Sequence, residues 1–208
     1  MKYESIDSKL FIKNRTNFSR EMKKNSIAFF NSNDIYPVSA DSTLPFEQHR
    51  DIFYLSGIDQ EESILVLSPD NPNPDLREIL FLKETNDHIA VWEGPKINKT
   101  QALEISGIKS VFWLNDLEKV IDKLVSSCQN IYINKNEHYR AKIETETREA
   151  RFNSWLVNKY PKKNKERSNP ILQRLRSIKD PKEISLIQQA CDITNKGFRR
   201  ILGFVKPG

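Results

Sequence analysis

The chain has 208 residues, of which 38% are hydrophobic and 29% charged, and its formal net charge is +5 at neutral pH. This length suffices for one good core, and the composition is that of a soluble globular protein, not of a fibrous or disordered one. No stretch approaches the ~20 apolar residues that span a bilayer, and residues 1–13 lack the apolar segment of a secretory signal. We therefore expect a cytoplasmic protein with no membrane partner.

The first part of the chain predicts a helix, a strand and a long loop. Apolar residues recur along one face of residues 8–24, which predicts a helix capped by Ser8. The apolar run at residues 26–31 predicts a strand. Residues 32–50 show little periodicity and contain two prolines. They predict a polar loop, and a loop of this length in a compact domain often carries function.

The central part predicts strands that alternate with helices. Strands at residues 52–55 and 63–67, with a turn at Gly57 and Asp59 between them, are expected to form a hairpin. Further strands are expected at residues 78–82, 88–92, 111–113 and 131–133. Helices are expected at residues 100–105, 116–126 and 145–160, with Asn115 as the cap of the second. This pattern predicts an α/β domain with a mixed β-sheet flanked by helices, and the hairpin argues against a purely parallel sheet.

Two helices complete the predicted pattern, a short one from Pro170 and a long final one. Asp180 suits the N-cap of the final helix, Pro181 its first position, and Glu183 completes a capping box. The helix is apolar on more than one side. We expect its apolar face to be covered by a partner outside this chain, with folding back onto the sheet as the alternative. Uncovered, this face would favour dimerisation.

Two other features are expected to be structural and not functional. Residues 159–167 are rich in bases but contain only one aromatic residue, so a solvated linker face is expected there and no nucleic-acid partner. A polyanion site is the weaker alternative. Cys128 and Cys191 lie far apart among apolar residues, which predicts two buried, reduced thiols.

The residues alone reveal no catalytic or metal site. His49, His88 and His138 are isolated, and the sequence contains no HExxH, CxxC, GxSxG, Walker or GxGxxG motif. The acidic pairs at residues 61–62 and 144 with 146 are expected to be solvated. No catalytic residue and no metal ligand is therefore predicted within this chain.

Three segments resemble a known family in order. Residues 38–58 contain Ser-Ala-Asp-Ser, then Pro-Phe-Glu-Gln and Asp-Ile-Phe-Tyr-Leu-Ser-Gly, residues 89–94 contain an apolar-x-Trp-x-Gly stretch, and residues 175–184 contain Lys-Asp-Pro-Lys-Glu-Ile. Each is weak alone, but together they are similar to the N-terminal domain of the aminopeptidase P family, the X-Pro aminopeptidases. Creatinase and prolidase share that architecture.

This resemblance implies a two-domain metallopeptidase that removes an N-terminal residue preceding proline. Residues 1–175 would be its non-catalytic N-terminal domain, which supports oligomerisation and walls the substrate cleft. Residues 176–208 would be the linker and first helix of a truncated catalytic domain with the pita-bread fold. The resemblance places two divalent ions, manganese above all, on ligands beyond this chain, so the 208 residues alone should be inactive. The expected partners are peptides with proline at the second position and further copies of the chain.

The resemblance also singles out two positions. Asp41 matches an aspartate near the active-site mouth of relatives, and a turn-forming role is its alternative. Trp92 matches a tryptophan that covers the active site of a neighbouring subunit, and packing in its own domain is its alternative. Asn169 departs from the arginine that relatives often place before the proline. The whole-protein alternatives are a protein-interaction module of the same architecture and a prolidase-like or creatinase-like hydrolase.

Overall fold

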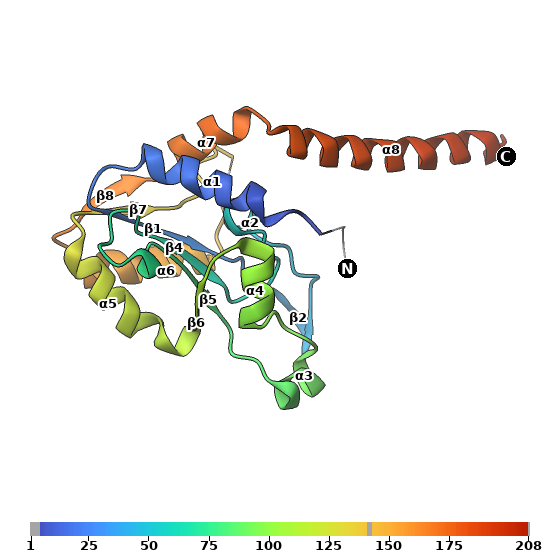
Figure 1. Ribbon diagram of the computed structural model, residues 1–208. Helices are drawn as coiled ribbons and strands as arrows, with labels where there is room; N and C mark the ends of the chain where they lie inside the picture. Colours follow the sequence, from blue (N-terminus) through green and yellow to red (C-terminus); the bar gives the residue numbers. More distant parts are fainter. Residues whose placement is uncertain (1–4, 141–142, 208) are drawn as a thin grey trace. The chain divides into compact units, whose positions relative to one another are not determined.

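The computed structural model of the chain describes residues 5–140 and 143–207, and it divides into the units Met1–Gln173 and Arg174–Gly208. The first unit contains a six-stranded sheet in the order β6-β5-β4-β1-β7-β8 (Figure 1). Its strands are β1 (Ser26–Asn31), β4 (Ile64–Leu67), β5 (Glu78–Leu82), β6 (Ser110–Trp113), β7 (Asn130–Ile133) and β8 (Asn164–Arg167). β4 runs antiparallel to β1 and β5, and the other neighbours are parallel. The predicted mixed sheet is confirmed.

Helices cover both faces of this sheet, because alternate strand residues point to opposite sides. On one face, Ile27 and Phe29 of β1 belong to a core cluster that α5 (Leu117–Ser127) and α6 (Arg148–Lys159) complete. On the other face, Phe18 of α1 (Ser8–Glu21) meets Phe30 edge-on, with ring centroids 5.2 Å apart. α2 (Arg50–Ser56) and α4 (Lys99–Ser106) pack beside α1. Figure 1 shows α1 and α5 on opposite sides of the strands.

Smaller elements connect these layers. β2 (Pro37–Ser39) and β3 (Ser42–Thr43) form a two-stranded sheet within the predicted loop of residues 32–50. The helix α3 (Asp87–Glu93) follows β5, and short 3-10 helices span Pro74–Leu76 (η1) and Leu114–Asp116 (η2). The chain continues through α7 (Asn169–Ser177) to α8 (Pro181–Phe204) in the second unit.

The predicted strand at residues 52–55 is wrong, since this run belongs to α2. The side chain of His49 caps α2 by accepting from the backbone N–H of Asp51 at 3.3 Å, and Gly57 ends it with φ 71°. Ile52 and Leu55 are both fully buried and three residues apart, which is a helical spacing. Four apolar residues are too few to reveal that period. The predicted hairpin does not form, and the antiparallel pairs that make the sheet mixed are β1 with β4 and β4 with β5.

The predicted strand at residues 88–92 is also wrong, because these residues form α3. The Asn86 side chain accepts from the backbone N–H of Ile89 at 2.9 Å and caps the helix, and Gly94 ends it with φ 76°. No residue of α3 is buried. Its apolar side chains therefore do not line the core, which is the property that the strand prediction assumed.

The basic stretch is not a linker, since residues 164–167 form the edge strand β8. β8 pairs in parallel with β7, and its lysine and glutamate are half-buried. Lys159 pairs with Glu118 at 2.6 Å and with Asp122 at 2.9 Å, and Lys165 donates to the carbonyl of Tyr160 at 2.7 Å. These bases are bonded within the unit, and charges on an edge strand discourage edge-to-edge association.

Four smaller predictions are also wrong. Asp7 caps α1 in place of Ser8, and Asn115 lies inside η2 without capping α5. Glu61, expected in solvent, is buried and paired with Lys96. Cys191 is exposed, whereas Cys128 is buried as predicted.

The second unit confirms the predicted helix start. Asp180 accepts from the backbone N–H of Lys182 at 2.8 Å, and the Glu183 carboxylate accepts from the backbone N–H of Asp180 at 2.8 Å. The helix extends over 24 residues, none of which is buried. Among residues 5–140 and 143–207, no helix combines the length and apolar character that crossing a membrane requires.

Candidate functional site

Asp41 lies in the turn that joins β2 to β3. Ala40 before it has φ 49°, and the backbone N–H of Leu44 donates to the carbonyl of Tyr36 at 2.9 Å, which closes the hairpin. The Asp41 residue is exposed. Aspartate favours such turns because its short side chain competes for local backbone groups. The position agrees with the turn-forming alternative and also leaves the carboxylate accessible to a ligand.

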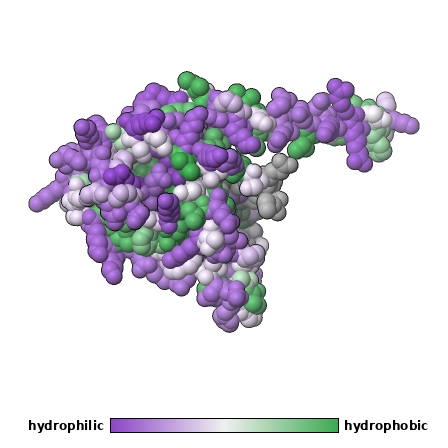
Figure 2. All heavy atoms as spheres, viewed as in Figure 1, coloured by the Kyte–Doolittle hydropathy of each residue, from purple (hydrophilic) through white to green (hydrophobic). Residues whose placement is uncertain are grey.

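Trp92 lies on α3 with 82% of its surface exposed. The neighbouring Glu93 is bonded to Lys83 at 2.7 Å, and Lys83 also pairs with Glu62 at 3.1 Å. The chain after α3 is fixed by the backbone N–H of Ile97, which donates to a buried glutamine. Ion pairs and hydrogen bonds thus hold this segment while the indole remains in solvent. Figure 2 shows hydrophobic surface at α3, at the bottom of the view.

The structure brings neither predicted residue into a catalytic constellation. Asp41 lies in the turn between β2 and β3, whereas Trp92 lies on a different element, α3. Within the described part of the chain, no group of three or more His, Cys, Asp or Glu side chains could hold a metal ion. Burial raises the pKa of the Cys128 thiol, and the contact of its sulfur with the Ser68 hydroxyl at 3.8 Å offsets this only in part. A neutral buried thiol is a poor nucleophile.

A buried polar network that the sequence did not reveal joins α2, α6 and the chain after β7. The Asn134 side-chain nitrogen lies 3.0 Å from carboxylate oxygens of both Asp51 and Glu149, and His49 Nε2 lies 3.7 Å from Glu149. Burial raises the pKa of Glu149, against the opposing influence of His49 and Asn134. Glu149 is 8% and Asn134 1% exposed. The network is therefore a cross-link between elements, since a peptide could not reach its carboxyl group.

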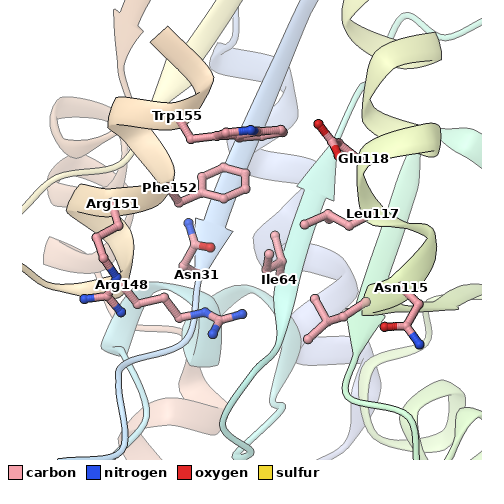
Figure 3. A pocket seen from close by; sticks show the side chains of 10 residues that line it. Asn31, Ile64, Asn115, Leu117, Glu118, Arg148, Arg151, Phe152 and Trp155 are labelled. Atoms are coloured by element: carbon pink, nitrogen blue, oxygen red, sulfur yellow. The ribbon is translucent and has the colours of Figure 1, made fainter. Parts of the chain in front are cut away.

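A pocket of about 450 Å³ opens between α5 and α6, above the ends of β1 and β4 (Figure 3). Its aromatic wall is formed by Phe152 and Trp155, whose ring centroids lie 5.4 Å apart. Figure 3 shows the Asn31 amide between Phe152 and Arg148. The lining residues are Asn31, Ile64, Leu114, Asn115, Leu117, Glu118, Arg148, Arg151, Phe152 and Trp155.

The sequence contains a signal for this pocket on α6. Arg148, Arg151, Phe152 and Trp155 follow one another at spacings of three, one and three residues, so they share one face of α6. A stripe of arginines next to aromatics on a helix is unusual for a face that packs on a core. The contribution of Asn31 could not be read in this way, since it depends on the register of β1 against β4.

Comparison with known proteins shows what this chain is similar to. Residues 11–132, more than half of the chain, match the family model described as "Aminopeptidase P, N-terminal domain". The Xaa-Pro aminopeptidase 3 of Homo sapiens is 27% identical over 80% of this chain and 33% of its own length. The Xaa-Pro aminopeptidase of Escherichia coli is 23% identical over 98% of this chain and 46% of its own length.

Solved structures show the same fold. Aminopeptidase P from E. coli, in a low-pH form, matches 99% of this chain with a TM-score of 0.81 at 20% identity. Aminopeptidase PepP from Pseudomonas aeruginosa matches 98% with a TM-score of 0.82 at 19% identity. The chain covers 47% and 46% of these two structures. It thus spans a third to about half of the length of the relatives described.

Proposed function

The chain belongs to the aminopeptidase P N-terminal domain family, and from this premise we propose that it is the non-catalytic N-terminal part of a metal-dependent X-Pro aminopeptidase. Such an enzyme removes the N-terminal residue that precedes proline. One observation carries the proposal: similarity to Xaa-Pro aminopeptidases extends over 98% of this chain but only 46% of the E. coli relative. The reaction is assigned to the part of the relatives that this chain does not span.

The proposal gives this domain a supporting role in the reaction. Two divalent ions, with manganese as the first candidate, would generate the attacking hydroxide in the whole enzyme. Within the described residues no group of His, Cys, Asp or Glu side chains fits such ions, so none is placed here and no chemical step passes through this chain. What the domain would supply is a wall of the substrate cleft and contacts between subunits.

Trp92 is the residue that best suits this supporting role. Its indole is 82% exposed on a helix that ion pairs hold at Glu93. A large apolar ring on a fixed helix can cover a proline-containing peptide and exclude water from it. We assign Trp92 to the cleft of a neighbouring copy in a homo-oligomer, and Asp41 to the cleft mouth, where its accessible carboxylate could meet the free amine of a peptide. A cytoplasmic location stays a prediction.

The test is hydrolysis of a short X-Pro peptide with added manganese. The 208-residue chain is compared with the complete chain that its gene encodes, and a peptide with alanine in place of proline is the control substrate. We expect hydrolysis of the X-Pro peptide only by the complete chain. Hydrolysis by the 208 residues alone would overturn the non-catalytic role. Inactivity of both would favour the interaction module of the same architecture.

A further inference from the structure

The pocket between α5 and α6 has the size and the firm walls of a ligand site. Its volume of about 450 Å³ lies within the ~300–1,000 Å³ typical of small-molecule pockets. Phe152 packs against Phe29 of the core, with ring centroids 5.5 Å apart, and against Trp155 on its other side. Ile64 and Leu117 add aliphatic surface. These contacts fix the apolar walls in place before any ligand arrives.

Asn31 supplies hydrogen-bonding groups that the protein itself does not use. The residue is 1% exposed and ends β1, where it stands opposite Ile64 of β4. Neither its side-chain nitrogen nor its side-chain oxygen has a hydrogen-bond partner within the described residues. Buried amides are normally bonded at both atoms. A donor and an acceptor side by side in a pocket wall match a second amide group.

Arg148 supplies the charge. Its Nε is buried and has no partner within the described residues, and no hydrogen bond to the rest of its guanidinium is found there. The next arginine on this face, Arg151, is occupied by Asp34 at 2.5 Å and by the carbonyl of Glu146 at 2.7 Å. Glu118 at the rim is occupied by a lysine at 2.6 Å. Within the described residues, the Arg148 guanidinium therefore has no partner at hydrogen-bonding distance.

We propose that this pocket binds the C-terminal residue of a peptide whose last side chain is apolar. The free carboxylate would pair with Arg148, whose planar fork suits two parallel hydrogen bonds to a carboxylate. The preceding amide would pair with Asn31, and the apolar side chain would lie against Phe152 and Trp155. A phosphate fits less well, since a second negative charge would face Asp34 and Glu62, both of which already attract Arg148. This proposal does not depend on the peptidase function.

The probe is N-acetyl-L-phenylalanine, followed by NMR through the indole N–H signals. The chain has three tryptophans, so three signals are expected, and Trp155→Phe identifies the one that reports on the pocket. A ligand of this size should bind with a dissociation constant on the order of 1 mM. The neutral analogue N-acetyl-L-phenylalaninamide should bind at least ~10-fold more weakly, because it lacks the carboxylate.

Three variants separate the site from its surroundings. Arg148→Gln should weaken binding of the acid ~10-fold or more, while Arg20→Gln, which removes the same charge from an exposed position on α1, should leave it unchanged. Asn31→Leu keeps a similar volume and should weaken binding without lowering the midpoint of thermal unfolding. If Arg148→Gln lowers that midpoint, Arg148→Lys, which keeps the charge but not the fork, replaces it.

The proposal is overturned by any of four results. These are no saturable shift of the Trp155 signal up to about ten times the expected dissociation constant, equal binding of acid and amide, unchanged binding by a folded Arg148 variant, or inorganic phosphate binding as tightly as the probe. The last result would leave an anion site with no preference for a peptide end.

Discussion

Two apolar stretches of similar composition behave in opposite ways in this protein. Ile27 to Phe30 in β1 are buried to 1% exposure or less, whereas Val91 and Trp92 in α3 are 76% and 82% exposed. The β2–β3 hairpin resembles α3, since Val38 is 59% exposed. Burial of apolar area drives folding, so the sheet with its helices determines stability. The apolar surface of α3 and the hairpin adds little to stability and is accessible from solvent.

Gly57→Ala tests the buried core and should have the largest effect on stability. Gly57 has φ 71°, and a Cβ there would lie 2.3 Å from the Phe11 ring inside the core. We expect the free energy of unfolding to fall by about 3–5 kcal/mol, from backbone strain and overpacking together. Chemical denaturation measures it.

Gly94→Ala is the comparison without a steric clash, since nothing lies within 4 Å of the added atom. Gly94 has φ 76° and ψ 170°, a conformation that is nearly restricted to glycine, so the change should cost backbone strain alone, about 1–3 kcal/mol. Equal losses in the two variants would contradict the steric role of Phe11 and place the whole effect in the backbone.

Arg15→Met tests the role of a buried charged side chain in the stability of the sheet and its helices. Arg15 is fully buried, bonded to Glu78 at 2.9 Å and to the carbonyl of Leu55 at 2.8 Å. Its removal leaves both acceptors without this donor, and we expect a loss of about 2–4 kcal/mol in the free energy of unfolding. Arg20→Met on the same helix is exposed and should change it by less than about 0.5 kcal/mol. A similar loss in both would mean that helix charge matters and burial does not.

Trp92→Ala tests the exposed apolar surface of α3. Because Trp92 is 82% exposed, the midpoint of thermal unfolding should hardly move. Under the proposed function, the complete chain assayed with added manganese should lose ~10–100-fold in kcat/KM for an X-Pro peptide, about 1.4–2.8 kcal/mol of transition-state stabilisation. Val91→Ala, at the neighbouring exposed position, is the control and should lose much less activity. An unchanged kcat/KM in Trp92→Ala would remove Trp92 from the cleft.

Sequence predicted the parts of this fold that depend on local pattern and missed those that depend on tertiary context. The capping box at Asp180 is predicted correctly because a cap is a local signal. A run of four apolar residues occurs in β1, β5, α2 and α3 alike, and such a run is compatible with either period. The strand prediction is therefore right for β1 and β5, which are buried in the sheet, and wrong for α2 and α3. The Arg148 stripe was visible on α6, but its pocket was not. That pocket requires Asn31, which only strand pairing brings to it.

The smallest expected effect concerns the buried network and pH. Burial raises the pKa of Glu149 above its ordinary value of 4.5, so the native state holds this proton more tightly than the unfolded state. Its contribution to stability is full below about pH 4.5 and is lost as the pH rises through the native pKa. Glu149→Gln has no proton to lose, and its amide oxygen can still accept from Asn134. The stability of this variant relative to the native sequence should therefore increase from about pH 4 to about pH 7.

Denaturation at several pH values measures this difference in stability, with Glu146→Gln, a change at an exposed residue close by, as the comparison variant. The sign is decisive because two influences on Glu149 oppose each other. Burial favours the neutral acid, while His49 at 3.7 Å favours the carboxylate. A relative stability of Glu149→Gln that falls with rising pH would show that the attraction to His49 exceeds the burial cost. The Glu149 carboxylate would then stabilise the fold, and would not be a buried acid that the fold tolerates.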